Sequence, residues 1–267
     1  PQRALRGLFA VQESTKAGWD QSSPGGDGSY SILMRSGLDT IGLDFGNYFN
    51  PPNGYSVSDG WNLLSLPQDP TVGHGKSAIY FTAISRAFSY ANSSGYSVLD
   101  PIRNGVGFWL KFSGTQNIGI PGNFRTADSI EVAGGWNLIG SLSLPVAISA
   151  IVQIPAGNVV SPFFPYRGNY ILVDSLSPHE GYFVKVKGTG KLYINSSSAA
   201  AVGGGEVSSI RHDLDETAGR ITIQNSKGVR QVLYFGRSDA LRAYAGFFDL
   251  PPTPPEDAFD ARFSSGS

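Results

Sequence analysis

A tandem duplication is the sequence feature that most constrains the fold of this chain. The motif Gly60–Leu63 (GWNL) recurs at Gly135–Leu138, and the aromatic strand pattern of Gly107–Phe112 recurs at Gly181–Val186. Matching positions lie 74 to 76 residues apart, except at one small insertion. A self-similar period of this length is too long for one turn of a solenoid and is typical of a small β domain.

The residues that recur indicate a duplicated structural core. They are aromatic residues, aliphatic residues, glycines, prolines and one lysine, whereas no carboxylate pair, histidine or hydroxyl nucleophile recurs. A large aromatic side chain in a repeated strand is most often a core anchor that buries roughly 200 Å². We therefore expect core anchors at Trp61, Trp109, Trp136 and Phe183. The alternative is a platform of tryptophans that stacks on sugars, but Phe183 in place of Trp109 favours apolar volume.

The composition predicts an all-β fold. Only 15% of the residues are charged, and 34 glycines and 17 prolines suit short strands joined by many turns. We expect tandem small β domains, namely two homologous repeats of about 75 residues, flanked by partial β-sandwich segments. The expected domain boundaries are 1–54, 55–122, 123–198 and 199–267.

Apolar alternation and turn residues predict where individual elements lie. The main expected strands span residues 7–13, 29–34, 40–47, 61–67, 96–99, 106–112, 219–223, 229–236 and 258–263. A turn-rich loop is expected at 19–28 and one or two helical turns at 145–152, whereas 78–90 fits either a short helix or a strand. The pair Asn104-Gly105 predicts a hairpin turn before the strand at 106–112.

Charge and cysteine content exclude several classes of function. The net charge is −1 with no basic run, so nucleic-acid binding is not expected. No window of 18 apolar residues is present, so no membrane insertion is expected. The chain has no cysteine, which rules out disulfides, thiolate metal sites and a cysteine nucleophile. We predict no metal and no cofactor.

The histidines and acids do not form a recognisable catalytic motif. His74, His179 and His212 lie in unlike contexts, and none has a second histidine four residues away. Glu180 could pair with Asp174 as the two carboxylates of a glycoside hydrolase, but the first repeat has no acid at the matching position. We therefore do not expect an enzyme, and a secreted hydrolase fragment is retained only as a second alternative function.

The first segment resembles a known adhesin domain. Its string VQESTKAGWDQSSP…YSILMRSG…GLDFGNY resembles the closing half of the B-type, prealbumin-like domains of bacterial surface adhesins, without their calcium-binding loop. In collagen-adhesin relatives a strand glutamate assists a Lys–Asn isopeptide bond, and Glu13 and Asn47 occupy positions that resemble that Glu and Asn. The simpler interpretation is that Glu13 is a solvated edge residue and Asn47 a turn residue.

The two repeats resemble a module of large secreted proteins. The string GWNLIGSLSLP…EGYFVKV resembles a repeat in multidomain surface proteins of the Bacteroidetes–Chlorobi group, which are typically exported by the type IX secretion system. The string LYFG…DLPPTPPEDAFDARF resembles a β domain that follows such repeats. The resemblance implies an extracellular or cell-surface location and no catalytic activity.

Both flanking segments look like parts of β domains, which suggests a polymer. An incomplete sheet exposes unpaired backbone groups that a strand from another copy can cover. We expect Leu8, Val11, Phe259 and Phe263 to lie in such inter-subunit strands of a head-to-tail filament, so that the main partner is another copy of the chain. Two alternatives are that the chain is part of a longer protein and that both segments pack on the repeats. A carbohydrate-binding or adhesion module, with glycans as partners, is the alternative function.

Overall fold

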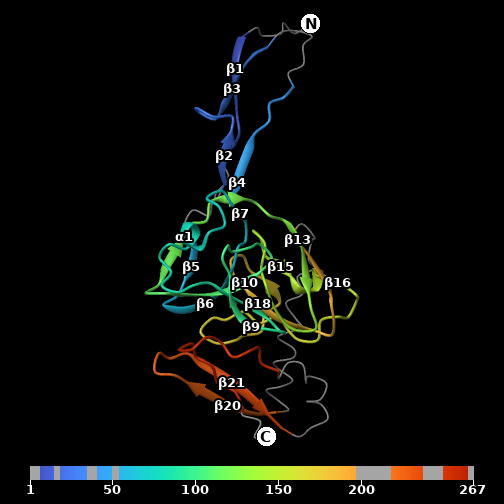
Figure 1. Cartoon of the computed structure of the whole chain (residues 1–267). Coiled ribbons are helices and arrows are strands. Elements are labelled where there is room, and N and C mark those ends of the chain that lie inside the picture. Colours follow the sequence, from blue (N-terminus) through green and yellow to red (C-terminus); the bar gives the residue numbers. More distant parts are fainter. Residues whose placement is uncertain are drawn as a thin grey trace.

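The computed structural model describes residues 7–14, 19–34, 41–49, 54–196, 218–236 and 249–263. Over these residues it contains many strands, a single four-residue α-helix and one 3-10 turn, which confirms the all-β prediction. Figure 1 shows three parts along one long axis: an N-terminal arm, a central body and a C-terminal ribbon at the opposite end.

The N-terminal arm consists of two antiparallel strand pairs that project from the body (Figure 1). The outer pair, here called the N-terminal ribbon, joins β1 (Gly7–Gln12) to β3 (Ser29–Met34). The inner pair joins β2 (Trp19–Ser23) to β4 (Gly46–Phe49). β4 also pairs with the body strand β12, which in turn pairs with β7, so the inner pair belongs to a sheet that reaches into the body. The loop predicted at 19–28 is therefore wrong over β2, and of the strand predicted at 40–47 only the last two residues lie in a strand.

The body contains both repeats. Repeat one comprises β5 (Tyr55–Val57), β6 (Gly60–Ser65), β7 (Asp69–Pro70), α1 (Lys76–Ile79), β8 (Phe88–Ala91), β9 (Gly95–Val98), β10 (Gly107–Phe112), β11 (Gln116–Ile118) and β12 (Gly122–Asn123). Repeat two comprises β13 (Ala127–Val132), β14 (Gly135–Ile139), β15 (Val146–Ala147), the 3-10 turn Ile148–Ala150, β16 (Val152–Ile154), β17 (Ser175–Leu176), β18 (Tyr182–Val186) and β19 (Gly190–Asn195). In each repeat a GWN strand pairs with the later aromatic strand, β6 with β10 and β14 with β18. The C-terminal ribbon pairs β20 (Gly219–Gln224) with β21 (Arg230–Phe235).

The two repeats share one sheet. Its order is β18-β14-β8-β10-β6, with β9 paired to β8, so β8 lies between the tryptophan strands β14 and β10 of the two repeats. The seam between the repeats is closed by two matching bridges, Leu64 with Glu180 and Val106 with Ile139. The Asn104-Gly105 turn exists but does not make a hairpin, because β10 pairs with β6 and β8 instead.

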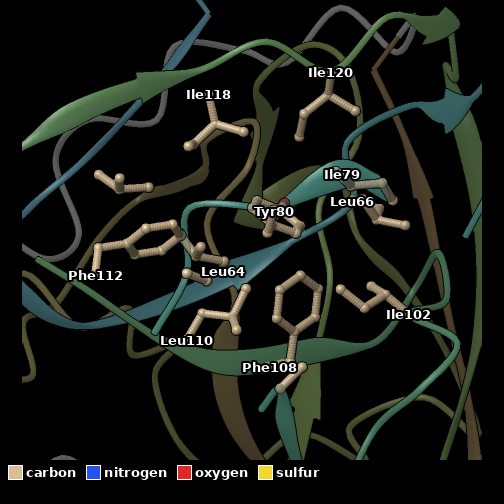
Figure 2. Close-up of a cluster of buried hydrophobic side chains, with 13 residues drawn as sticks. Leu64, Leu66, Ile79, Tyr80, Ile102, Phe108, Leu110, Phe112, Ile118 and Ile120 are labelled. Atoms are coloured by element: carbon tan, nitrogen blue, oxygen red, sulfur yellow. The ribbon is translucent and has the colours of Figure 1, made fainter. Parts of the chain in front are cut away.

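Each repeat nevertheless keeps its own apolar core. The core of repeat one, shown in Figure 2, is built around Tyr80, Phe108 and Phe112, and that of repeat two is built around Phe163, Tyr182 and Val184. A third cluster lies on the opposite face of the shared sheet, because its strand residues alternate with those of the two cores, and it draws on both repeats: Leu63, Trp109, Leu138, Phe164, Tyr166, Tyr170 and Phe183. The boundary between the cores agrees with the duplication, whereas the third cluster and the sheet join the repeats into one body.

The recurring GWN motif builds the same turn twice. Gly60 and Gly135 adopt φ angles of +87° and +96°, which only glycine tolerates easily. The following asparagine then closes the turn: the side-chain amide of Asn62 donates to the carbonyls of Ser58 and Gly60, and Asn137 makes the equivalent bonds. The motif recurs because it fixes how each tryptophan strand enters the shared sheet.

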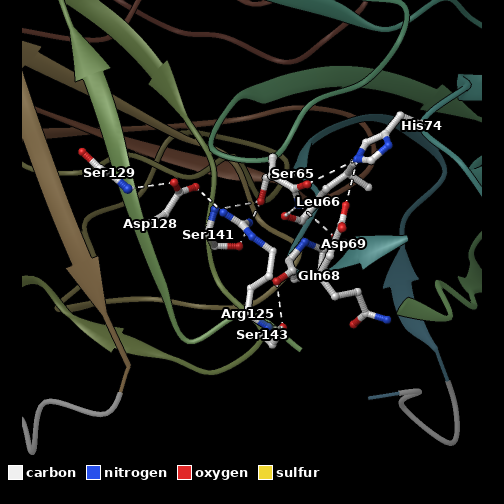
Figure 3. A network of polar contacts seen from close by, with 12 residues as sticks. Ser65, Leu66, Gln68, Asp69, His74, Arg125, Asp128, Ser129, Ser141 and Ser143 are labelled. Carbon is white, nitrogen blue, oxygen red and sulfur yellow. Dashed lines mark hydrogen bonds and ion pairs between the residues drawn. The ribbon is translucent and has the colours of Figure 1, made fainter. Parts of the chain in front are cut away.

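Serine side chains hold the seam together in a buried polar network (Figure 3). The Ser65 hydroxyl donates to the Glu180 carbonyl at 2.8 Å and accepts from Ser141 at 2.9 Å. The Ser143 hydroxyl donates to the carbonyl of Pro67 at 2.8 Å, again across the two repeats. Arg125 forms an ion pair with Asp128 beside this network. Because the three serine hydroxyls are hydrogen-bonded across the seam, their burial is tolerated and the register of the seam is specified.

The seam leaves no room for side chains at two equivalent glycines. A Cβ atom on Gly107 would lie 2.7 Å from the Ile139 carbonyl oxygen, and one on Gly181 would lie 2.6 Å from that of Leu64. We expect Gly107→Ala and Gly181→Ala each to lower the free energy of unfolding by about 1–3 kcal/mol, because the backbones of the two repeats must move apart. Chemical denaturation measures this. Gly119→Ala, where a Cβ meets nothing within 4 Å, is the control and should have little effect.

Candidate functional site

The site is an aromatic surface on the shared sheet. Trp109 and Phe183, at equivalent positions of the two repeats, are fully buried. Trp61 and Trp136 lie half-buried at the margin of the same cluster. Four tyrosines, Tyr90, Tyr96, Tyr166 and Tyr170, lie around these side chains. We call the surface formed by Trp61, Trp136, Tyr96, Tyr166 and Tyr170 the aromatic face.

Each marginal tryptophan is paired with a lysine from the neighbouring strand. The ladder places Lys111 opposite Trp61 and Lys185 opposite Trp136. The two ammonium groups lie 5.8 and 5.9 Å from the centres of the respective indole rings, within the range of cation–π attraction. The lysine that recurs in the duplicated sequence thus has the same role twice: it brings one positive charge to each end of the aromatic face.

A proline-rich segment, residues 249–263 and here called the strap, crosses this face. The aromatic side chains donate four hydrogen bonds to its backbone carbonyls. These bonds run from the Tyr170 hydroxyl to Pro252 (2.8 Å), from the Tyr96 hydroxyl to Thr253 (2.9 Å), from the Trp61 indole N–H to Glu256 (2.8 Å) and from the Tyr166 hydroxyl to Phe259 (3.0 Å). A segment rich in proline has few N–H donors, so a surface that supplies donors suits it.

The two lysines also bind the strap. The Lys185 ammonium lies 2.7 Å from the Asp249 carboxylate, and that of Lys111 lies 3.2 Å from Asp257. Both pairs are open to solvent, so each contributes little to stability by itself. Together they place the acidic residues of the strap at the two basic ends of the face, which fixes its direction.

The tyrosines of the face remain hydrogen-bond donors over a wide pH range. Burial raises the pKa of Tyr96 and of Tyr166 to about 12, and burial also raises the pKa of Tyr170. The phenols are therefore protonated at any physiological pH. The face does not switch its hydrogen-bonding character near neutrality.

The C-terminal ribbon covers the strap from the other side. The buried side chain of Gln231 accepts a hydrogen bond from the Ala261 amide at 3.2 Å, and Lys227 reaches Asp59 of repeat one at 3.2 Å. A cleft of about 380 Å³ remains between Trp136, Lys185, the strap and β21. The last segment thus packs on the repeats, which is one of the alternatives that the sequence left open.

The strand predicted at 258–263 is wrong. These residues are irregular, because the strap is held by side chains of the face and makes no ladder with it. The Phe259 carbonyl accepts from Tyr166, and the Phe263 side chain is half exposed at the cleft. Arg262 pairs with Asp260 at 2.6 Å. Leu8 and Val11 do lie in a strand, β1.

His179 occupies the core of the other repeat. Its ring stacks on Tyr55 at 4.7 Å and on Tyr80 at 5.8 Å, and its Nε2 lies 3.0 Å from the Tyr80 hydroxyl. Complete burial lowers the pKa of His179 to about 3. The imidazole is therefore neutral at pH 7 and connects repeat two to the core of repeat one.

The acids and histidines considered for catalysis have structural partners. Glu180 binds the Arg167 guanidinium at 2.6 and 2.9 Å and accepts from the Tyr182 hydroxyl at 2.7 Å. His74 lies 3.1 Å from Asp69, and His212 lies outside the described residues. Within the part of the chain that the structure describes, no three His, Asp or Glu side chains are grouped to hold a metal ion.

Glu13 and Asn47 lie against each other in the N-terminal arm. The Asn47 amide nitrogen lies 2.9 and 2.8 Å from the two carboxylate oxygens of Glu13. Asn47 is a residue of β4, so its interpretation as a turn residue is wrong, whereas Glu13 is exposed directly after β1 as expected. The isopeptide crosslink stays an untested alternative.

No family model, no curated protein and no solved structure matches the chain. Among the described residues, no helix is long and apolar enough to cross a lipid bilayer.

The strap contacts were missed by sequence reasoning, although two signals pointed to them. Tyr96 and Tyr170 occupy matching positions in the duplication, as do Tyr90 and Tyr166, so tyrosine hydroxyls recur with the tryptophans. A run of prolines needs donors from elsewhere in the structure. Neither signal tells which surface meets which segment, because the bonded residues lie up to 195 positions apart.

Proposed function

We propose that this protein is an extracellular, non-catalytic structural protein of the bacterial cell surface that assembles head to tail by strand addition. The observation that carries the proposal is the N-terminal ribbon. Leu8 and Leu33 face each other across its two strands, and their side chains are 72% and 52% exposed. An exposed ribbon with an apolar cross-strand pair is a template for pairing with another chain.

The opposite end of the molecule offers a matching surface. The C-terminal ribbon also exposes apolar side chains, among them Ile221 and Phe235, and it lies at the far end from the N-terminal ribbon (Figure 1). Contact between the N-terminal ribbon of one copy and the C-terminal ribbon of the next joins two different surfaces. Such a heterologous contact extends into a filament when its rotation does not close a ring.

Assembly is expected to depend on the apolar pair of the N-terminal ribbon. Leu8→Lys should raise the protein concentration needed for assembly at least fivefold and so shift the chain from oligomers towards monomers. The reason is that a charge would face Leu33. Sedimentation velocity and negative-stain electron microscopy at neutral pH measure this. Val152→Lys is a matched control, since Val152 is a 58% exposed apolar residue of a body strand away from both ribbons. A wild-type chain that stays monomeric at millimolar concentration would contradict the proposal.

A glycan-binding module is the second candidate, and the cleft beside Trp136 favours it. The cleft combines an indole with the charged groups of Lys185, Asp249 and Arg262, which are able to bond sugar hydroxyls. A flat platform that stacks on sugars is disfavoured, because Trp109 is fully buried and the indole N–H of Trp61 donates to the strap. Retention on polysaccharide columns that Trp136→Ala abolishes would favour this candidate over a purely structural one.

A further inference from the structure

The contacts between the strap and the aromatic face run in one direction. In the four hydrogen bonds described above, the donor is always a side chain of the face and the acceptor is always a backbone carbonyl of the strap. Both ion pairs likewise place the lysine on the face and the carboxylate on the strap. This is the pattern of a receptor and a peptide ligand, in which an aromatic surface binds the carbonyls of a proline-rich segment.

We infer that the aromatic face is a binding site for a proline-rich segment flanked by two carboxylates, and that the tail of a second copy of this chain can fill it in place of the copy's own tail. This goes beyond the proposed function, because it uses none of the residues of the N-terminal ribbon. It adds a second kind of contact between copies, which depends on side-chain recognition instead of strand pairing.

The duplication explains why the aromatic face binds such a segment. Tyr96 and Tyr170 are equivalent residues of the two repeats, and their hydroxyls bind two consecutive carbonyls, those of Thr253 and Pro252. Prolines on both sides of these carbonyls fix the backbone φ angle, so little conformational entropy is lost when the segment docks. The pair of tyrosines therefore recognises an extended chain at the centre of the strap.

The lysines define the charge pattern of the ligand. Lys111 and Lys185 are also equivalent residues, and their carboxylate partners, Asp257 and Asp249, are eight positions apart in the strap. The ligand is thus an acid at each end of a proline-rich stretch. The spacing of the two aspartates along the strap lets each reach one lysine, and the two lysines come from different repeats.

The segment that would move between copies is the C-terminal ribbon together with the strap, residues 218–263. They belong together because Gln231 of the ribbon binds the Ala261 amide of the strap. The ribbon pairs only within itself among the described residues, and the strap forms no ladder with the repeats. Residues 197–217 join this tail to repeat two, and 21 residues can span up to about 70 Å. Exchange of an identical element between copies is a low-cost route to association.

Charge reversal tests the exchange directly. The variant K111E/K185E places acids on the face against the acids of its own strap, and D249K/D257K places lysines against lysines. We expect each variant alone to be monomeric when dilute, with a loosened tail. An equimolar mixture should form a heterodimer, because each face then meets a strap of opposite charge on the other copy. Light scattering after size-exclusion chromatography measures the mass.

Two controls keep the test interpretable. The quadruple variant K111E/K185E/D249K/D257K restores opposite charges within one chain, so it should be as stable as the wild type and monomeric when dilute. Leu8→Lys added to both partners should leave the heterodimer intact, which separates this contact from the N-terminal ribbon. A mixture that elutes as two monomers, while the quadruple variant regains stability, would overturn the exchange between copies.

A peptide titration tests the face itself. A fluorescein-labelled peptide of residues 249–263 should bind the D249K/D257K chain saturably, measured by fluorescence anisotropy. Trp61→Phe in that chain should weaken binding about 3- to 10-fold through loss of the bond to the Glu256 carbonyl. Tyr193→Phe, a change at an exposed residue of β19 outside the aromatic face, should change it less than twofold. Equal effects of the two substitutions, or no binding of the peptide, would overturn the assignment of the face.

Discussion

Replacing Trp109 by alanine is expected to lower the free energy of unfolding by about 3–5 kcal/mol, the loss typical of a large aromatic residue removed from a core. Trp109 is fully buried in the cluster shared by the two repeats, with its ring 4.9 Å from that of Tyr166 in an edge-on arrangement. The cavity would open between the repeats, where neither repeat core can close it alone. Urea denaturation followed by far-ultraviolet circular dichroism measures the loss.

The duplication supplies its own control for this substitution. Phe183 occupies the equivalent position in repeat two, so Trp109→Phe makes the two halves alike and should cost only about 1–2 kcal/mol. Trp136→Phe, at a half-buried position, should cost less than about 1 kcal/mol. If Trp109→Ala cost less than Trp136→Phe, the shared cluster would not be the joint between the repeats.

Local sequence patterns are sufficient to predict elements whose pairing is local or repeated. The strands at Gly7–Gln12, Gly60–Ser65, Gly95–Val98 and Gly107–Phe112 all agree with alternation and turn residues. They agree because alternation reflects which face of a strand is buried, which is a local property. β2 at Trp19–Ser23 was not predicted because its sequence, WDQSS, shows no alternation of apolar and polar residues.

Long-range pairing is what the sequence could not reveal. Nothing in the residues of β8 predicts that it lies between β10 and β14 and so joins the repeats into one sheet. The strap is a similar case, because its residue Thr253 and the partner Tyr96 are 157 positions apart. They interact through a side-chain hydroxyl, which every tyrosine has, and a backbone carbonyl, which every residue has. Specificity there depends on the position of the groups in space and not on their identity.

In the sequence, His179 is a histidine without a metal-binding partner. Its burial in the folded protein makes it an acid-sensitive group of the body. Because burial lowers its folded-state pKa to about 3, the folded protein holds the imidazole neutral while the unfolded chain protonates it below about pH 6.5. The stability that depends on this neutral ring is therefore complete above pH 6.5 and is lost as the pH falls from 6.5 towards 3.

We expect the free energy of unfolding to fall by about 2 kcal/mol between pH 7.5 and pH 5.0, since each pH unit below the unfolded pKa removes about 1.4 kcal/mol. Urea titrations at the two pH values measure the difference. His179→Gln should be less stable than the wild type at pH 7.5, because it loses the stacking on Tyr55 and Tyr80, but it should lose much less on acidification. His74→Gln is the matched control and should keep the acid sensitivity, since its imidazole is partly exposed beside Asp69. An acid sensitivity that persists in His179→Gln and disappears in His74→Gln would show that the joint between the repeats tolerates a charged ring.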